Sequence, residues 1–314
     1  MTDQNPDSDS DVVHDHARLL ASLGADGVRL GSGGEATVYS LDRQRVVRVF
    51  RADPGPEGAE LAEIYRRWAS PSADVGTRAF ELPTVLDDGF SHELHWQVLR
   101  RIPGTEVGHL LTHTTPPDRG RLLSAYLRGS TEVAAIDVAP TYGTLLRGRS
   151  YDSWADCLRD RLTVPSPVLR ALLAATVADF DNVVARFDAD LDGLYDGPAR
   201  LVHVDYFPGN VMALGSDDGY RVSGVLDFAS HSLFGDPLLD VTGAVLMADM
   251  LTDVTPVEQR QLAHEAASLV GDRLAAVMET YRVFYALYYA MDDGLVPWST
   301  RQLTEIAAGR SLLG

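Results

Sequence analysis

Short runs of apolar residues over the first third of the chain predict β-strands. The runs are rich in β-branched and aromatic residues and are separated by glycine-rich or polar turns, as in antiparallel strands linked by hairpins. The predicted strands cover residues 28–30, 37–41, 46–50, 82–86 and 95–102. One helix is predicted over residues 56–70, because Pro56 stands at a first helical position and apolar residues then recur at helical spacing.

The apolar pattern changes to the 3.6-residue period of helices after Pro103 and Gly104. The predicted helices cover residues 119–135, 153–162, 167–187, 256–274, 279–291 and 300–312. A strand-rich segment interrupts them, with strands at residues 201–204, 211–214 and 222–226. We therefore expect an α+β protein with two lobes. A small antiparallel β-lobe with one helix spans residues 13–103, and a larger, mainly helical lobe spans residues 104–314.

The first twelve residues are rich in Asp and Ser, and so polar a stretch buries too little apolar surface to fold. We expect residues 1–12 to form a disordered acidic tail. They lack the basic start and apolar run of a secretory signal, and no apolar stretch in the chain reaches the roughly 18 residues of a membrane span. The single cysteine, Cys157, excludes an internal disulfide and a cysteine-built metal site. The expectation is a soluble, cytoplasmic protein.

Charge narrows the classes of partner. The 314 residues include 45 acidic and 27 basic ones, which gives a net charge of −18, and every basic residue is Arg. A negative field repels phosphate backbones and anionic lipids, which argues against nucleic acid and membrane surfaces as partners. The same field attracts cations, so a cationic small molecule fits the composition better. The sequence indicates no oligomeric state.

The clearest chemistry lies in the strand-rich segment of the helical lobe. Asp205 and Asn210 follow one predicted strand, and Asp227 follows another. Phosphoryl transfer needs a carboxylate that orients or accepts the proton of the attacking hydroxyl, and oxygen ligands that hold Mg²⁺ against nucleotide phosphates. These three side chains supply such groups, although any one of them alone would equally suit a helix cap or an Asx-turn.

The spacing of these residues matches a known pattern. His203-x-Asp205-x-x-x-x-Asn210, with Asp227 followed by Phe, resembles the catalytic loop and metal-binding motif of the aminoglycoside phosphotransferase and choline kinase family, which has a protein-kinase-like fold. The run GDPLLD at residues 235–240 is similar to that family's Gly-Asp-Pro segment. The resemblance implies a phosphotransferase that uses ATP or GTP with Mg²⁺. It also implies that Asp205 is the catalytic base or hydroxyl-positioning group and that Asn210 and Asp227 are Mg²⁺ ligands.

Four neighbouring residues are expected to shape the loop. The resemblance implies that His203 is a scaffold residue, as a hydrogen-bonded core histidine would be, and that Asp236 and Asp240 cap or brace the loop. Val204 departs from the family, which usually has Gly at this position. Because a β-branched residue disfavours positive φ, we expect the geometry of this loop to differ slightly.

A glycine-rich turn in the β-lobe, Gly31-Ser32-Gly33-Gly34, resembles the loop that covers the ATP phosphates in the same family. Glycine lets backbone N–H groups approach phosphate oxygens because it has no Cβ. Taken alone, this run equally suits an ordinary hairpin turn. By the resemblance, Val38 packs on the adenine.

The family's phosphate-binding Lys on the third strand is replaced by Arg48. Alternation along the strand places Arg48 on the same face as Val46 and Phe50. Arg binds phosphate with two parallel hydrogen bonds but is longer and planar, so it is no neutral exchange for Lys. We expect Glu63 of the following helix to pair with Arg48, and Glu60, one turn earlier, is the alternative.

Residues 95–102 resemble the strand that enters the hinge between the family's two lobes. By that resemblance, Leu99 lines the back of the adenine pocket, and backbone groups of Arg100 and Ile102 meet the adenine edge. Because backbone atoms make these contacts, the identity of the side chains at these positions says almost nothing about adenine binding.

The C-terminal helices offer residues for an acceptor site, namely Tyr281, Tyr285, Tyr288, Tyr289, Asp292, Asp293 and Trp298. Aromatic rings beside carboxylates suit a cationic or polyhydroxylated acceptor. The four tyrosines also recur at helical spacing, which more often indicates a packed core face, and Asp292-Asp293-Gly294 is typical of a helix end and turn. An aminoglycoside, a sugar, an amino alcohol, a macrolide and another natural-product hydroxyl all remain open as the acceptor.

Our leading hypothesis is a Mg²⁺-dependent kinase that transfers the γ-phosphoryl group of ATP to a small-molecule hydroxyl, directly and without a phosphoenzyme. The alternative is a catalytically weak pseudokinase that binds a nucleotide or metabolite. The departures from the family's pattern at Arg48 and Val204 motivate this alternative. Protein phosphorylation fits less well, because no Ala-Pro-Glu segment or long activation loop follows Asp227.

Overall fold

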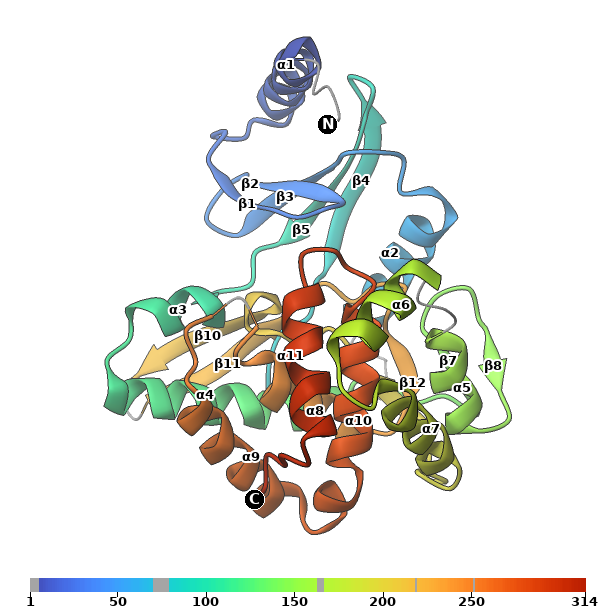
Figure 1. Cartoon of the computed structure of the whole chain (residues 1–314). Coiled ribbons are helices and arrows are strands. Elements are labelled where there is room, and N and C mark those ends of the chain that lie inside the picture. The colour runs from blue at the N-terminus through green and yellow to red at the C-terminus, as the bar shows by residue number, and fades with distance from the viewer. Residues whose placement is uncertain (1–5, 70–78, 163–166, 218, 251) are drawn as a thin grey trace. The chain divides into compact units, whose positions relative to one another are not determined.

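The polypeptide divides into two units of unequal size. The computed structural model describes residues 6–69, 79–162, 167–217, 219–250 and 252–314, except for the side chains of residues 6–14. The first unit comprises Met1–Asp74 and Glu81–Pro103, and the second comprises Val75–Phe80 and Gly104–Gly314. Antiparallel strands dominate the first and helices the second, as expected for an α+β chain (Figure 1).

The first unit is built on an antiparallel sheet with the strand order β1-β2-β3-β5-β4. Its elements are β1 (Arg29–Ser32), β2 (Ala36–Ser40), β3 (Arg45–Phe50), α2 (Gly55–Ala69), β4 (Val85–Ser91) and β5 (Leu94–Arg100). The three predicted N-terminal strands and the helix after them are confirmed. Because β3 lies between β2 and β5, Val38, Arg48 and Gln97 are neighbours across the three strands.

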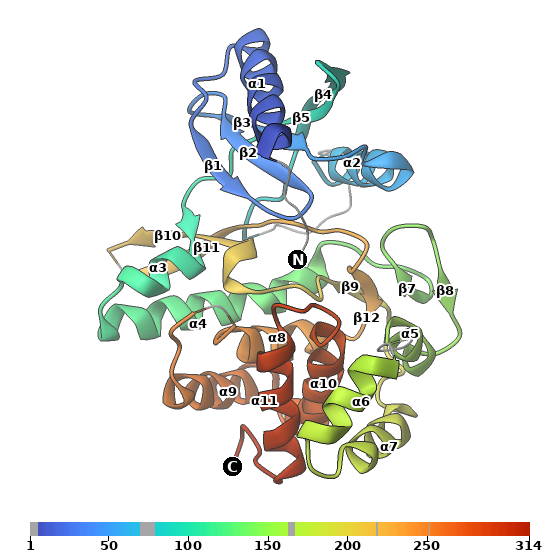
Figure 2. The same ribbon diagram turned by 45° about the horizontal axis from the view of Figure 1, so that its top comes forward.

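Helix α1 (Pro6–Leu23) corrects the expectation of a disordered tail from residue 6 onward and gives this unit a second helix. Its C-terminal part packs on the sheet, where Leu19 and Leu20 join Val47 and Val49 in a buried apolar cluster (Figure 2). Proline and acidic residues favour the start of a helix, and the apolar residues that anchor α1 follow directly after them. The remaining part of the expected tail, residues 1–5, lies outside the described residues.

Strand β4 begins later than predicted and forms a tight hairpin with β5. Ser91 pairs with Leu94, so only His92 and Glu93 form the turn. Both turn residues have positive φ, at 52° and 62°, as two-residue hairpin loops commonly require. Such turns usually carry Asn-Gly or Asp-Gly, so the sequence His-Glu gave no signal for this one.

The second unit is mainly helical. Its α-helices are α3 (Val107–His113), α4 (Pro116–Glu132), α5 (Trp154–Arg161), α6 (Pro167–Thr176), α7 (Phe180–Leu191), α8 (Leu238–Met247), α9 (Pro256–Val270), α10 (Arg273–Tyr289) and α11 (Val296–Ala307). Helices α8 and α10 pack against each other, α4 and α9 pack on α8, and α7, α9 and α11 pack on α10 (Figure 1). None of the helices that the structure describes is long and apolar enough to cross a membrane.

Two small antiparallel sheets accompany these helices. One has the order β11-β10-β6 and consists of β6 (Thr105–Glu106), β10 (Val211–Ser216) and β11 (Gly219–Val225). The other has the order β8-β7-β12-β9 and consists of β7 (Tyr142–Thr144), β8 (Ser150–Tyr151), β9 (Arg200–Val202) and β12 (Leu233–Gly235). Strands β9, β10 and β11 form the predicted strand-rich segment, and they position the candidate catalytic residues.

Two helix predictions for this unit need correction. The helix predicted over residues 167–187 is two helices, α6 and α7, because the chain turns through a left-handed residue, Asp179, at φ 59°. Asp tolerates that conformation better than most residues. Helix α8 was not predicted, because all ten of its residues are buried and its sequence therefore has no polar face.

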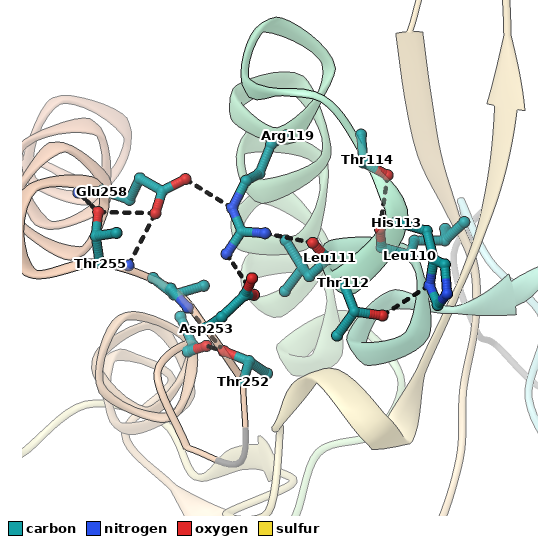
Figure 3. A network of polar contacts seen from close by, with 12 residues as sticks. Leu110, Leu111, Thr112, His113, Thr114, Arg119, Thr252, Asp253, Thr255 and Glu258 are labelled. Atoms are coloured by element: carbon teal, nitrogen blue, oxygen red, sulfur yellow. Dashed lines mark hydrogen bonds and ion pairs between the residues drawn. The ribbon is translucent and has the colours of Figure 1, made fainter.

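Helices α3, α4 and α9 are joined by one buried guanidinium group (Figure 3). Arg119 Nε donates to Glu258 at 2.7 Å, its Nη2 donates to Asp253 at 2.8 Å, and its Nη1 donates to the carbonyl of Leu111. Glu258 also forms a capping box with Thr255 at the start of α9. Burial raises the pKa of Glu258, but the hydrogen bonds from Thr255 and the charge of Arg119 outweigh it, so the pKa is lowered and the group stays a carboxylate.

Candidate active site

The candidate catalytic loop follows β9 and is held to helix α8 by its backbone. The N–H groups of His203 and Val204 donate to the two carboxylate oxygens of Asp240, at 2.7 and 2.9 Å. Val204 is fully buried and has φ 70°. The loop therefore keeps a left-handed residue where the sequence argued against one. The expected slight change in geometry is replaced by backbone strain, which costs roughly 1–3 kcal/mol at a β-branched residue.

Asp240 braces the loop from a fully buried position, as expected for a residue that does not touch substrate. Burial raises its pKa to about 7, although the two backbone hydrogen bonds act in the opposite direction. Those bonds stabilise the charged form and burial opposes it. Asp240 thus titrates near neutrality while it holds the loop.

Both carboxylate oxygens of Asp205 have a side-chain donor. Asn210 Nδ2 donates to Oδ2 at 2.9 Å and to the Asp205 carbonyl at 3.0 Å. The Tyr289 hydroxyl, from α10, donates to Oδ1 at 2.5 Å. Asp205 is only partly buried, so its carboxylate is fixed in position and still reachable from solvent. Sequence reasoning named Tyr289 only as an acceptor-site or core residue, and no spacing signal links it to Asp205.

His203 is fully buried, and its ring supports the loop as the scaffold role requires. Burial, with a smaller contribution from His231, lowers its pKa to about 4, so the ring is neutral at pH 7. Nε2 lies 2.7 Å from the carbonyl of Leu226. A carbonyl only accepts, so Nε2 carries the proton. Among the described residues, Nδ1 of this ring has no hydrogen-bond partner.

The two candidate metal ligands lie in neighbouring loops of this unit. Asn210 ends the 3₁₀ turn η2 (Pro208–Asn210), and its carbonyl accepts from the N–H of Leu226, one residue before Asp227. The Asn210 amide nitrogen is turned toward Asp205, and its side-chain oxygen accepts no hydrogen bond from the residues that the structure describes. Asp227 is exposed, with φ 62°. Amide and carboxylate oxygens are the donors that Mg²⁺ prefers, so the chemistry of these residues fits that ion.

Asp236 is a structural residue of the same region. It is fully buried, caps the start of α8 through the N–H of Leu238 at 3.1 Å, and accepts from both terminal nitrogens of Arg273. The Tyr281 hydroxyl also donates to Asp236, and Trp154 Nε1 donates to that hydroxyl at 3.0 Å. These contacts occupy both carboxylate oxygens, in agreement with the expected capping and bracing role.

In the first unit, the glycine-rich turn joins β1 to β2, as the sequence predicts. Gly33 N–H donates to the carbonyl of Ala36 at 2.9 Å, and Ser32 Oγ accepts from Arg51 at 2.8 Å. Gly31, Gly33 and Gly34 have no positive φ, and a Cβ on any of them would meet no described atom within 4 Å. The fold of the described chain therefore gives no reason for glycine here, whereas a ligand that approaches the backbone closely would.

Arg48 shares a face of β3 with Phe50, as alternation predicts, and its guanidinium lies 5.0 Å from the centre of that ring. Its Nη2 is 3.2 Å from the carboxylate of Glu35, which belongs to the turn between β1 and β2. Glu63 does not take the expected part, because its side chain is 77% exposed and pairs with Arg66 at 3.7 Å. Glu60 as a partner of Arg48 stays a prediction.

The residues that the resemblance assigned to the adenine pocket lie on β2, on β5 and just after β5. Leu99 is buried on β5, and Val38 is half-buried on β2. The N–H of Arg100 donates to the carbonyl of Thr84 at 3.0 Å, so it has a partner inside the protein. The N–H of Ile102 has no acceptor in the described part of the chain. Of these two amide N–H groups, only that of Ile102 is left for a ligand.

The aromatic residues of α10 differ in burial and in the partners of their hydroxyls. Tyr281 and Tyr285 are fully buried, with hydroxyls that bond Asp236 and the carbonyl of Leu239, so the core interpretation holds for them. Tyr288 is half-buried, and the Arg161 guanidinium lies 5.9 Å from its ring centre. Asp292 and Asp293 are exposed in the turn after α10, where Asp292 accepts from the N–H of Gly294.

A family model and several solved structures are similar to this chain. Residues 26–278 match the model of the phosphotransferase enzyme family. The crystal structure of aminoglycoside phosphotransferase APH(4)-Ia superposes with a TM-score of 0.68 at 21% identity, covering 95% of this chain and 99% of that one. A thermostable mutant of that enzyme, in a ternary complex with ADP and hygromycin B, gives 0.67 at 21% identity over 93% and 97%.

A third solved structure is the gentamicin complex of APH(2")-IIa, with a TM-score of 0.56 at 14% identity over 100% of this chain and 98% of that one. The comparison with curated proteins gave no match. At these identities the structural matches show the fold. It is the kinase-like fold of aminoglycoside phosphotransferases, as the sequence resemblance implied.

Proposed function

The chain belongs to the phosphotransferase enzyme family, and we propose that it transfers the γ-phosphoryl group of ATP to a hydroxyl group of a small molecule. One observation carries the proposal. The Asp205 carboxylate is held on both oxygens and remains partly exposed, in a loop that carries Asn210 and is hydrogen-bonded, through Leu226, to the loop of Asp227.

In the proposed reaction, the acceptor hydroxyl donates a hydrogen bond to Asp205. As the acceptor oxygen forms its bond to the γ-phosphorus, the bond from that phosphorus to the β–γ bridging oxygen breaks and ADP leaves with that electron pair. The proton of the hydroxyl passes to Asp205. Transfer is direct, so no phosphoenzyme forms.

Bound Mg²⁺ would neutralise charge on the phosphate oxygens. Asn210 Oδ1 and the Asp227 carboxylate would hold it, because both are oxygen donors and the Asn210 nitrogen already bonds Asp205.

Nucleotide binding is proposed for residues of the first unit. The backbone of Gly31-Ser32-Gly33-Gly34 would meet phosphate oxygens, which would explain glycines that the fold itself does not require. Arg48 would add a positive charge. For the adenine, the N–H of Ile102, the side chains of Val38 and Leu99, and the carbonyl of Arg100 are the proposed contacts. ATP is favoured over GTP, because the APH(4)-Ia complexes contain ADP or AMP-PNP.

For the acceptor, an aminoglycoside-type compound is our first choice. The related structures hold hygromycin B and gentamicin, both aminoglycosides. The net charge of −18 and the exposed Asp292 and Asp293 would favour a polycationic acceptor.

The test is ADP release by the purified protein with MgATP against a panel of aminoglycosides, macrolides, amino sugars, nucleosides and choline. We expect acceptor-dependent turnover. Asp205→Ala should reduce it by about 10²- to 10⁴-fold, the usual contribution of a general base, while MgATP affinity stays nearly unchanged. Asp181→Ala, which removes an exposed carboxylate from α7, is the control for lost charge. Equal turnover by Asp205→Ala and the control would remove Asp205 from its role.

A further inference from the structure

We propose that Tyr289 is a positioning residue for phosphoryl transfer, and that its hydroxyl sets the orientation of the Asp205 carboxylate. The inference rests on the proposed function, and it adds to that function a residue 84 positions away in the sequence. It is argued from the geometry of one carboxylate, one phenol and the aromatic rings around that phenol.

The carboxylate of an Asp rotates easily, because its terminal torsion is broad and roughly two-fold. One donor on one oxygen would leave that rotation partly free. Asp205 has two donors that come from different elements: Asn210, five residues ahead in the same loop, and Tyr289 on α10. Since each donor takes a different oxygen, the two together fix both the position and the rotation of the group.

The phenol of Tyr289 is itself held in place. Its side chain is 8% exposed, and its ring stacks on Tyr285 at 6.1 Å with an interplanar angle of 9°. The rings of Tyr288 and Trp298 meet it edge-on, at 5.3 and 6.0 Å. Trp298 is fixed in turn, because its Nε1 donates to Asp249 at 2.8 Å. A ring packed on three sides keeps its hydroxyl at Asp205, so this contact is preorganised.

The hydroxyl of Tyr289 acts as a donor. Burial and the nearby charge of Asp205 raise the pKa of Tyr289 well above its ordinary value, so the phenol keeps its proton at neutral pH. A carboxylate offers about four lone-pair positions, and the two donors leave room for a third. The acceptor hydroxyl can therefore bond Asp205 while Tyr289 remains in place.

Helix α10 supplies a matched control. Tyr285 lies one turn before Tyr289, belongs to the same ring stack and is fully buried, but its hydroxyl donates to the backbone carbonyl of Leu239 at 3.1 Å. Replacing either tyrosine with Phe removes one buried hydroxyl and leaves the ring. The two variants should lose similar thermal stability, and only Tyr289→Phe alters a group at Asp205.

The experiment compares single-turnover phosphoryl transfer by the wild type, Tyr289→Phe and Tyr285→Phe, with the rate expressed per MgATP-binding molecule. Misplacing a catalytic group by about 1 Å can cost about 100-fold, so we expect Tyr289→Phe to slow transfer by about 10- to 100-fold. Acceptor KM and MgATP affinity should stay within about twofold, because the lost contact acts on the reacting group. Tyr285→Phe should transfer at nearly the wild-type rate.

Equal rates for the two variants would overturn the inference, because the loss would then come from packing alone. A faster Tyr289→Phe would also overturn it, since the hydroxyl would then be occupying the place of the acceptor. If the wild type transfers phosphate to no hydroxyl, water included, the proposed function is wrong and this inference falls with it. If the wild type is active and the two variants transfer phosphate at equal rates, this inference is wrong and the proposed function still stands.

Discussion

The carboxylate of Asp240 accepts a hydrogen bond from the backbone N–H of Val204, a β-branched residue held at φ 70°. The other oxygen of the same carboxylate accepts a second hydrogen bond, from the backbone N–H of His203. The energy that these bonds and the burial of the Val204 side chain contribute offsets the strain of the left-handed backbone. The loop therefore adopts a left-handed turn before Asp205 with Val at position 204, where Gly would adopt the same turn without strain.

Glycine at position 204 should cost unusually little stability. Replacing a buried Val with Gly normally loses about 3 kcal/mol through lost burial, the cavity and chain entropy. At Val204, relief of roughly 1–3 kcal/mol of strain should return most of that. Val202→Gly is the matched control, because Val202 is equally buried but lies in strand β9. Urea unfolding should show a deficit about 2 kcal/mol smaller for Val204→Gly, and equal deficits would mean that the strain is not there.

The contribution of His203 to stability should be lost on acidification. The pKa of this residue is lowered to about 4 in the folded protein, against about 6.5 for an unperturbed histidine, so the unfolded chain binds a proton first as the pH falls. The contribution of the neutral ring is present above pH 6.5 and is lost as the pH falls toward 4, by on the order of 3 kcal/mol. In the variant His203→Gln this slope should disappear.

The measurement is the difference in unfolding free energy between wild type and His203→Gln at several pH values from 7 to 4. Taking the difference removes the titration of Asp240, whose raised pKa has the opposite effect: its contribution is lost as the pH rises through about 7. A difference that does not change with pH would show that His203 is not buried as a neutral ring.

Removing the charge of Glu35 should tighten nucleotide binding. Arg48 pairs with Glu35 at 3.2 Å, and a phosphate that binds Arg48 must compete with that carboxylate. Because Glu35 is 72% exposed, the pair is weak, and Glu35→Gln should lower the dissociation constant of MgATP by about two- to fivefold. Calorimetry at low salt measures this, and added salt should shrink the effect. Glu81→Gln, an exposed change in the same unit, controls for net charge, and weaker binding by Glu35→Gln would contradict the competition.

The hydrogen bonds of Arg119 with Glu258, Asp253 and the carbonyl of Leu111 should contribute strongly to the stability of the helical unit. Arg119→Ala leaves Glu258 Oε1 and the carbonyl of Leu111 without the donor that Arg119 supplies, which should cost about 3 kcal/mol. The partner Asp253 adds little, because it is 65% exposed. Arg121, two residues further along α4, is 62% exposed and pairs only with Asp118 among the described residues, so Arg121→Ala should change stability by less than about 0.5 kcal/mol. Similar unfolding curves for the two variants would show that the contacts of Arg119 do not make this contribution.

What the sequence could predict depended on local pattern. The three strands around the glycine-rich turn alternate cleanly and have hairpin signals between them, so their positions were predictable. Helix α8 was not, because complete burial removes the polar face on which helical periodicity depends. The turn at His92 and Glu93 was missed because neither residue type is typical of positive φ.

The candidate site shows the same division. Asp205, Asn210 and Asp227 stand at a fixed spacing, so a motif was enough to bring them together. Tyr289 recurs at helical spacing and was expected in the core, but the destination of its hydroxyl depends on how α10 packs against the loop. The pair of Arg48 with Glu35 likewise depends on the fold of a turn, and helical position alone favoured Glu63 wrongly.

Helix α1 also matters for anyone who trims this protein for expression. The family match begins at residue 26, three residues after the helix ends, so a fragment cut at that boundary would retain every motif of the site. It would also leave Val47 and Val49 without the cover of Leu19 and Leu20. These valines point away from Arg48 on the same strand, so the trimmed fragment would expose an apolar patch on the face of the sheet opposite Arg48 and would tend to aggregate.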